Sequence, residues 1–264
     1  KRGARKENGD TYDVPADITY KEWKKKYVGQ AEEKEKNEIQ YMSNSFRPQY
    51  GKRNTLHVDQ ENIDVKTVEN SAFKMFTDVD AERRNKAVRL AEKTFLEIRE
   101  QLPAGFELPE IAVIDFERHN LRNDAIGGYQ RETDRLYINS KYDTKEKILK
   151  FVNKQKGKFA NTTEYAPYLH ELGHKYYEDC IKTLAKTQNI TYNRAKLIID
   201  ARIEKYVHEN NNYNQTLLNS VSAYADDGFG KNNYTETVAE CFSIRAINAY
   251  ADGLLKQIEG DEVK

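Results

Sequence analysis

The chain contains the stretch Tyr168-Leu169-His170-Glu171-Leu172-Gly173-His174-Lys175-Tyr176, in which three residues separate two histidines. If this stretch is helical, His170 and His174 project from the same face of the helix, one above the other. Two imidazoles placed in this way can occupy two positions of a tetrahedral zinc site. Glu171 would reach a water at that zinc without binding the zinc itself, which is the arrangement of a metallopeptidase with glutamate as general base.

The neighbours of the two histidines favour a buried helix. Leu169 and Leu172 are apolar and Gly173 is small. A solvated surface helix rich in His and Glu would show the same H-E-x-x-H pattern by chance. Burying two histidines and a glutamate without partners, however, would cost about 1–3 kcal/mol for each unpaired polar group. A metal ion is a single partner that removes this cost.

A third protein ligand is expected downstream. The continuation H-E-x-x-H-x-x-G-x-x-H is excluded, because Tyr177 stands at its glycine position and Cys180 at its last histidine. The segment Tyr234–Phe242 offers Glu236 and Glu240 instead, four residues apart on one helical face among apolar neighbours. Two carboxylates on a buried helix favour a bound cation, and the spacing alone leaves open which of them is the ligand.

The two segments together resemble the glutamate zincins of the anthrax lethal factor type. That family pairs H-E-[FL]-G-H with a downstream E-x-x-A-E-x-F helix, and this chain has HELGH at 170–174 and ETVAECF at 236–242. The resemblance covers about residues 75–255. It implies one Zn²⁺ per chain, with His170, His174 and Glu236 as ligands and Glu171 as the base. It also implies that Glu240 supports a ligating histidine through the other ring nitrogen.

The same family carries Ser-x-Tyr-[Ala/Gly] before its second helix, and Ser222-Ala223-Tyr224-Ala225 is similar to it. By this resemblance, Tyr224 would stabilise the tetrahedral intermediate. The gap from Asp226 to Asn233 is longer than the family pattern, so Tyr234 is an alternative for that role.

The segment before the zinc-binding pattern predicts strands. The run Ile111–Phe116 is short and mostly apolar, which is typical of an interior strand, and Gly127–Gln130 with Arg135–Asn139 predicts a hairpin around residues 131–134. By resemblance to the family, the edge of the sheet that pairs with an extended peptide substrate would consist of Leu136, Tyr137, Ile138 and Asn139. An ordinary protected edge strand is the alternative.

Apolar residues at spacings of three and four predict two further core helices, Val79–Leu102 and Asn193–His208. Their apolar faces consist of Val88, Ala91, Phe95, Ile98 and Leu102 in the first, and of Ala195, Ile198, Ile199, Ile203 and Tyr206 in the second. The segment Lys145–Lys158 is basic, which is typical of a solvated helix and is also compatible with a preference for acidic substrates.

The overall composition of the chain excludes few classes of binding partner. Lys plus Arg and Asp plus Glu both number 43, so the net charge indicates neither a nucleic-acid site nor a membrane surface. No apolar run approaches the roughly 20 residues that a bilayer span requires. Cys180 and Cys241 adjoin the two candidate metal-binding helices, and we expect two reduced thiols, because one pair makes no disulfide framework.

Residues 1 to about 60 are polar, with the charge runs Lys24–Lys26 and Glu32–Lys36. Such a composition buries too little apolar surface to fold independently and predicts an arm or linker. Within it, GDTYDVPADITYKEW at residues 9–23 resembles the end of the phage minor head (Mu F-like) domain, which closes with V-P-A-D-M-[ST]-Y-x-x-W; Ile18 replaces the usual Met. This resemblance implies phage head or portal proteins as partners.

These patterns, together with the resemblance to the glutamate zincins, predict an α+β, zincin-like fold with a small mixed sheet, an active-site helix and a second helix carrying the third metal ligand. We expect residues 1–60 to be a polar arm that ends a Mu F-like domain, and residues 61–264 to be a metallopeptidase domain. The expected function is that of a zinc-dependent endopeptidase acting on peptide or protein substrates.

The resemblance to the head protein implies an effector or processing domain of a phage or prophage head protein. It would be located in the virion or the bacterial cytoplasm, or be delivered into a host cell. A self-processing protease that trims head proteins is one alternative, and a non-catalytic virion domain with a structural metal is another. Structural zinc sites are closed, whereas catalytic sites keep an exchangeable water, so this property separates the alternatives.

Overall fold

The computed structural model describes residues 4–5, 11–12, 65–68, 72–78, 86–210 and 217–260, and it divides the chain into two units, Lys1–Thr55 and Leu56–Lys264. In the first unit, strand β1 (Ala4–Arg5) pairs antiparallel with β2 (Thr11–Tyr12). The remainder of the expected arm, the expected boundary near residue 60 and most of the segment 9–23 lie outside the described residues.

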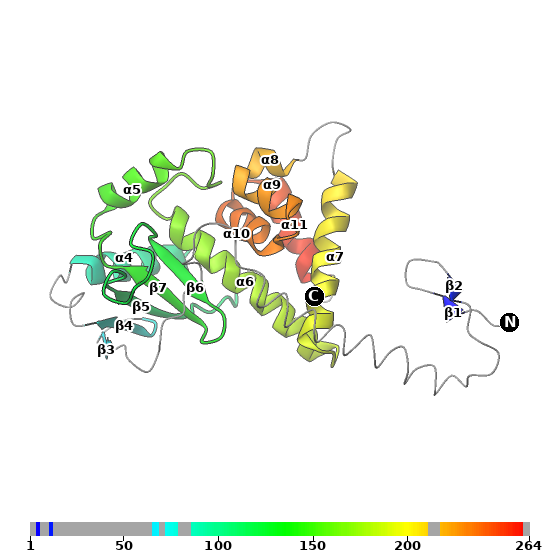
Figure 1. The fold of residues 1–264 in the computed structure, drawn as a ribbon, viewed down its shortest axis with the longest axis horizontal. Coiled ribbons are helices and arrows are strands. Elements are labelled where there is room, and N and C mark those ends of the chain that lie inside the picture. Colours follow the sequence, from blue (N-terminus) through cyan, green and yellow to red (C-terminus); the bar gives the residue numbers. More distant parts are fainter. Residues whose placement is uncertain are drawn as a thin grey trace. The chain divides into compact units, whose positions relative to one another are not determined.

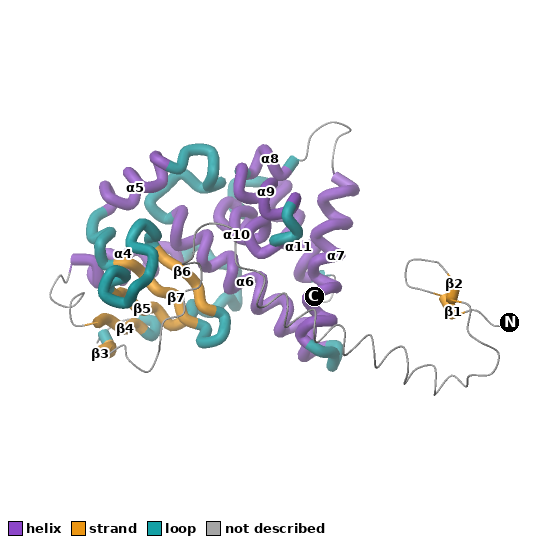
Figure 2. Tube along the Cα trace, in the orientation of Figure 1, coloured by secondary structure: helices purple, strands orange, loops and turns teal. Residues whose placement is uncertain are grey.

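The second unit contains a mixed five-stranded sheet with the strand order β3–β4–β5–β7–β6 (Figures 1 and 2). The central strands β4, β5 and β7 are parallel, and β3 and β6 each pair antiparallel with their neighbour. The bounds of the strands are β3 Val65–Thr67, β4 Met75–Asp78, β5 Glu110–Ile114, β6 Gly127–Gln130 and β7 Arg135–Asn139.

The predicted hairpin is confirmed, because β6 and β7 pair antiparallel across residues 131–134. The predicted edge is wrong: β7 lies between β5 and β6, and β6 is the edge strand. The physical reason is visible in the burial of β7, where the four residues expected to face substrate, Leu136, Tyr137, Ile138 and Asn139, are all buried. A strand that is covered on both faces is a continuous apolar run and belongs inside a sheet.

Eight helices follow or interrupt the sheet within the described part of the second unit (Figure 1). Their bounds are α4 Lys86–Arg99, α5 Lys145–Lys154, α6 Ala166–Thr187, α7 Tyr192–Asn210, α8 Leu218–Val221, α9 Ala223–Gly230, α10 Tyr234–Ile244 and α11 Ala249–Glu259. The architecture is therefore a mixed α+β arrangement, as the sequence predicts. Among these helices, none has the length and apolar composition that crossing a membrane requires.

The two helices expected to pack in the core are present. In α7, Ala195, Ile199 and Ile203 are buried, and Ile198 and Tyr206 pack against the core. In α4, the buried residues include four of the five predicted: Val88, Ala91, Phe95 and Ile98. Residues 79–85, where the prediction began this helix, lie outside the described residues.

Helix α6 occupies the centre of the second unit and contacts β6, α7 and α10 (Figures 1 and 2). Near its start, the ring of Tyr168 meets that of Phe95 from α4 edge-on, with centroids 5.4 Å apart. Further along, the ring of Tyr176 packs against Phe242 of α10. Because it is packed on both sides, α6 can present side chains to the sheet edge and to α10 at the same time.

Both cysteines are free thiols, in agreement with the expectation. Cys241 is fully buried in α10, and Cys180 of α6 is partly buried. Burial raises the pKa of the Cys180 thiol to about 12, so at neutral pH it is an unreactive thiol and not a nucleophile.

Candidate metal centre

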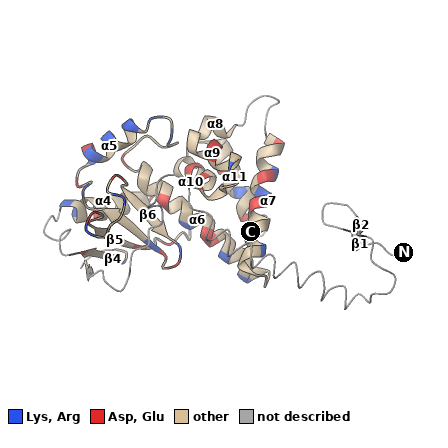
Figure 3. Ribbon diagram, in the orientation of Figure 1, with Lys and Arg blue, Asp and Glu red and all other residues tan. Residues whose placement is uncertain are grey.

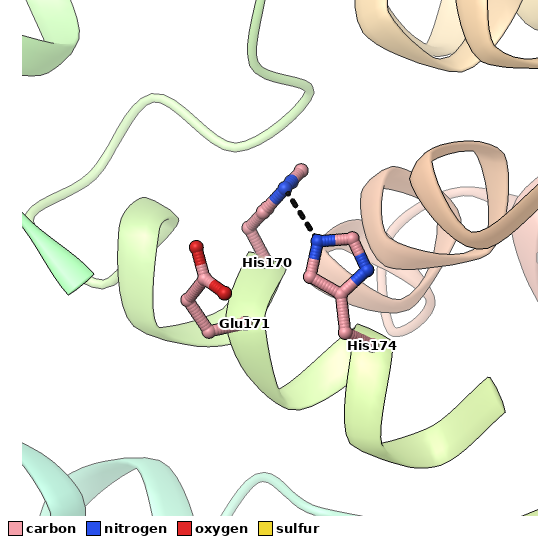
Figure 4. Close-up of side chains that lie close together, drawn as sticks. All are labelled: His170, Glu171 and His174. Carbon is pink, nitrogen blue, oxygen red and sulfur yellow. Dashed lines mark hydrogen bonds between the residues drawn. The ribbon is translucent and has the colours of Figure 1, made fainter. Parts of the chain in front are cut away.

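The candidate centre begins with three side chains of α6 (Figure 4). His170 and His174 lie one turn apart, and their Nε2 atoms are 3.1 Å from each other. The carboxylate of Glu171 lies on the adjacent side of the helix, and it belongs with both histidines to one group of potential ligand atoms within 4.8 Å of one another. The helical spacing has therefore brought the three residues together.

The other ring nitrogens are held by α10. His170 Nδ1 is hydrogen-bonded to Glu240 Oε1 at 2.5 Å, and His174 Nδ1 to Thr235 Oγ1 at 2.8 Å. A carboxylate accepts hydrogen bonds, so Nδ1 of His170 carries the proton and its Nε2 has a free lone pair in the neutral ring. Partners of this kind fix the orientation of both rings and direct the two Nε2 atoms toward one point.

Glu236 completes a triangle of donor atoms. Its Oε2 lies 3.3 Å from Nε2 of His170 and 3.9 Å from Nε2 of His174. A tetrahedral zinc ion with bonds of about 2.0–2.2 Å requires ligand atoms about 3.3 Å apart, and the three observed separations are close to this value. Neutral imidazole nitrogens and a carboxylate would repel one another at these distances unless a proton or a metal ion lies among them.

The electrostatics of the triangle also favour a cation. Burial lowers the pKa of His170, but the hydrogen bonds and charges of Glu236 and Glu240 outweigh burial and hold that pKa well above its ordinary value. Burial acts to raise the pKa of Glu236, yet the charge of His174 and the hydrogen bond to His170 lower it to about 2. The residues present therefore fit a divalent cation, which His170, His174 and Glu236 could hold.

Glu171 is oriented by the edge strand and not by the histidines. Its Oε2 accepts a hydrogen bond of 2.9 Å from the backbone N–H of Tyr129 in β6. The strand passes close to it at Gly127, where an added Cβ would lie 3.7 Å from Glu171 Cγ and 3.0 Å from the carbonyl oxygen of Tyr137. The tight distance is the one to Tyr137, so the glycine relieves crowding against β7, while the distance to Glu171 is an ordinary van der Waals contact.

The outward-facing groups of β6 follow from its register. Asn139 donates its N–H to the Ile126 carbonyl, so that pair is hydrogen-bonded, and hydrogen-bonded pairs alternate along an antiparallel ladder. The N–H and C=O groups of Gly128 and Gln130 consequently point to β7. Those of Gly127 and Tyr129 point away from the sheet, on the side of Glu171.

Tyr224, and not Tyr234, is the tyrosine beside the histidines. The ring of Tyr224 lies 6.3 Å from that of His170, and Phe159 contacts both rings edge-on. Burial raises the pKa of Tyr224, so its hydroxyl remains a hydrogen-bond donor. The hydroxyl of Tyr234 bonds to Glu204 of α7 instead, and its ring packs on Phe229, away from the triangle.

Helix α9 places Tyr224 because Ser222 caps its start. The Ser222 hydroxyl accepts the N–H of Ala225, which is the usual role of serine at a helix N-cap. The backbone N–H of Tyr224 then donates to the carbonyl of Lys158, and the ammonium of Lys158 lies 5.9 Å from the centroid of the Tyr224 ring. The loop after α5 is thereby attached to α9 next to the candidate centre.

The loop between α5 and α6 is attached at two further points. Ala160 N–H donates to Glu240 Oε2 at 2.5 Å, and the Asn161 side-chain amide donates to the carbonyl of Ser243. The Glu240 carboxylate therefore bridges His170 and this loop. Helix α5 carries several basic residues (Figure 3), and two of them form ion pairs, Lys145 with Glu164 and Lys147 with Asp143.

Small residues allow the helices to approach. A Cβ on Gly173 would lie 2.5 Å from Cα of Ala239, so α6 and α10 cross at direct backbone contact. A Cβ on Gly228 would lie 2.9 Å from Cβ of Glu236, so α9 is similarly close to α10. The glycine of HELGH therefore allows α6 to approach the backbone of α10 at Ala239.

Four residues at the centre were not predicted from the sequence: Tyr129, Phe159, Thr235 and Lys175. Thr235 and Lys175 are next to predicted residues in the sequence, so their positions on the two helices could have indicated them. Tyr129 and Phe159 come from an edge strand and a loop, whose position depends on pairings far apart in the chain.

Comparison with protein-family models, with curated proteins and with solved structures finds no match to this chain.

Proposed function

We propose that the chain is a zinc-dependent endopeptidase with a zincin-like fold, in which His170, His174 and Glu236 hold the metal and Glu171 is the general base. The observation that carries the proposal is the triangle of Nε2, Nε2 and Oε2 atoms with edges of 3.1, 3.3 and 3.9 Å. The hydrogen bonds of Glu240 and Thr235 to the two outer ring nitrogens add the supporting partners that such ligands usually have.

When bound, a zinc ion supplies a Lewis acid that lowers the pKa of a coordinated water and polarises a carbonyl oxygen. Glu171 then accepts the proton of the attacking water and returns it to the leaving amine of the peptide. Tyr224, whose ring lies beside that of His170 and whose hydroxyl stays protonated, donates a hydrogen bond to the oxyanion that develops on the peptide carbonyl.

An extended peptide would pair with β6 and not with β7. The groups available on the edge are the N–H and C=O of Gly127 and the C=O of Tyr129, since the N–H of Tyr129 is bonded to Glu171. Backbone pairing of this kind binds a peptide with little dependence on its side chains. The proposed substrate class is therefore an extended segment of a peptide or protein.

A catalytic metal is favoured over a structural one by the number of ligands. Structural zinc sites use four protein ligands, whereas catalytic sites use three and keep one position for water or substrate. The carboxylate of Glu171 is the nearest further candidate, and it is oriented by Tyr129. A zinc that is bound tightly but supports no cleavage would instead fit the role of a structural virion domain.

The substitution Glu171→Gln tests the proposal. Gln keeps the shape of the side chain but cannot accept a proton, so about one zinc per chain should remain while cleavage of an unstructured protein substrate falls on the order of 10²–10⁴-fold. Glu100→Gln, an exposed position beyond the end of α4, is the matched control. Full activity of Glu171→Gln, or the absence of zinc from the wild-type chain, would contradict the proposed mechanism.

A further inference from the structure

Lys175 directly follows the second histidine and is buried, with an exposed fraction of only 4%. Its ammonium lies 3.2 Å from Asp134 Oδ1 and 2.9 Å from Asp179 Oδ2. It also lies 5.8 Å from the centroid of the Phe106 ring. A buried ammonium group is costly unless it is paired, and here one of its partners comes from outside α6, in the turn between β6 and β7.

Asp134 extends this contact toward the edge strand. It adopts a left-handed backbone conformation with φ of 49°, and its Oδ1 accepts the hydroxyl of Tyr129 at 2.9 Å. Its backbone carbonyl accepts the N–H of Glu110, which attaches the turn to β5. Asp134 therefore connects the ammonium on α6 to the side chain of a β6 residue.

Tyr129 is consequently held at both ends. Its hydroxyl bonds to Asp134, and its backbone N–H bonds to Glu171. Glu171 and Lys175 lie four residues apart on α6, so the chain of contacts begins and ends on the same helix. The hairpin is thus attached to α6 at two points, one of which is the carboxylate proposed as the base.

We propose that Lys175 is a positioning residue for the general base, acting through Asp134 and Tyr129 to hold the β6 N–H that orients Glu171. A contact to substrate is excluded by its burial. The kinetic part of this inference rests on the proposed peptidase function, whereas the structural part does not. A base displaced by about 1 Å can lose on the order of 10²-fold in rate, so a remote contact that fixes its position has a large effect.

The test uses Lys175→Met, which keeps the length of the side chain and removes the charge. Without the ion pair, the edge strand β6 should lose its attachment to α6 at Tyr129, so we expect the Tyr129–Glu171 bond to open. The Gly128 N–H points to β7, and β7 stays paired with β5, so the bonds between β6 and β7 should remain. Hydrogen exchange followed by NMR should show the Tyr129 amide exchanging roughly tenfold faster, with the Gly128 amide unchanged, because a hydrogen bond to a charged group is worth about this factor or more. Glu171→Ala gives the rate for complete loss of the bond.

Two further variants complete the test, one as an alternative to Lys175→Met and one as a control. Asp134→Asn removes the carboxylate charge, and asparagine tolerates the left-handed conformation, so this variant folds even if Lys175→Met does not. It should accelerate exchange at Tyr129 in the same way. Lys182→Met, an exposed lysine two turns along α6, should leave exchange unchanged.

Kinetics supply the second measurement. Lys175→Met and Asp134→Asn should retain zinc and lower kcat on the order of 10²-fold with KM nearly unchanged, because orientation and not binding is lost. Unchanged exchange at Tyr129 in both variants would overturn the inference. If the wild-type chain cleaves nothing, the proposed function fails, while the exchange data still decide whether Lys175 holds Tyr129 and Glu171 in place.

Discussion

Glu236 and Glu240 lie one helical turn apart on α10, yet their carboxylates face different atoms. Oε2 of Glu236 faces the Nε2 atoms of both histidines, whereas Glu240 bonds to Nδ1 of His170 and to the N–H of Ala160. We therefore expect Glu236→Ala to abolish tight zinc binding. Glu240→Ala should retain zinc with affinity about 10–100-fold weaker, the usual cost of losing a supporting partner. Titration with a zinc indicator measures both, and the opposite order would show that the third ligand is Glu240.

The two tyrosines considered for the oxyanion differ in their surroundings. Tyr224 lies beside His170, and Tyr234 bonds to Glu204 of α7. We expect Tyr224→Phe to lower kcat on the order of 10²-fold without loss of zinc, as removal of one oxyanion donor typically does. Tyr234→Phe should leave kcat unchanged and reduce the free energy of unfolding by about 1 kcal/mol. A peptidase assay and a denaturant melt on both variants separate the roles; equal kcat values in the two would exclude Tyr224.

At the scale of the helices, the contact between α6 and α10 determines whether the ligands meet. Gly173→Ala would place a Cβ 2.5 Å from Cα of Ala239, so the two helices must separate. Overpacking of this kind typically costs about 1–3 kcal/mol, and here it also moves the helix that carries Glu236. We expect a lower melting temperature together with weaker zinc binding.

Gly230→Ala is the matched control for that substitution. No atom lies within 4 Å of a Cβ at this position, and its φ is not in the left-handed region. The control should therefore bind zinc as the wild type does. Normal zinc affinity in Gly173→Ala would show that the centre tolerates a wider helix crossing than the structure indicates.

At the scale of the whole molecule, the proposed zinc site predicts that zinc and protons compete for His170. The pKa of His170 is held well above its ordinary value, since Glu236 and Glu240 outweigh the opposing effect of burial. A raised histidine pKa stabilises the zinc-free fold below about pH 6.5, and this contribution is lost as the pH rises through the folded-state pKa. Zinc requires the neutral imidazole, so we expect the proposed zinc ion to bind more tightly as the pH rises.

The expected outcome is a pH-dependent difference in melting temperature between the zinc-loaded and chelator-treated protein. With free zinc about 100-fold above its dissociation constant, the stabilisation is about 2.7 kcal/mol, or roughly 5–10 °C for a domain of this size. The difference should widen as the pH is raised from about 6.5, which differential scanning fluorimetry in matched buffers can follow. A difference of zero, or one independent of pH, would argue against metal at these residues.

Local spacing in the sequence was enough to identify several residues that lie together in the candidate centre. The period of the α-helix places residues four apart on one face, so His170 with His174, and Glu236 with Glu240, could be paired without knowledge of the fold. The apolar faces of α4 and α7 and the hairpin of β6 and β7 were predictable for the same reason. Each of these features depends only on residues close together in the chain.

Only the tertiary structure determined the features that depend on contacts between residues far apart in the chain. The strand order makes β6 the edge and encloses β7, because β5 pairs with β7 across 20 intervening residues of chain, from Asp115 to Asp134. With α6 and α10 crossing at Gly173, Glu236 lies near the Nε2 atoms of both histidines, and Glu240 bonds to Nδ1 of His170. The connection from Lys175 through Asp134 and Tyr129 to Glu171 links a helix to a strand edge. No local pattern encodes it, since it exists only when the sheet and α6 are packed together.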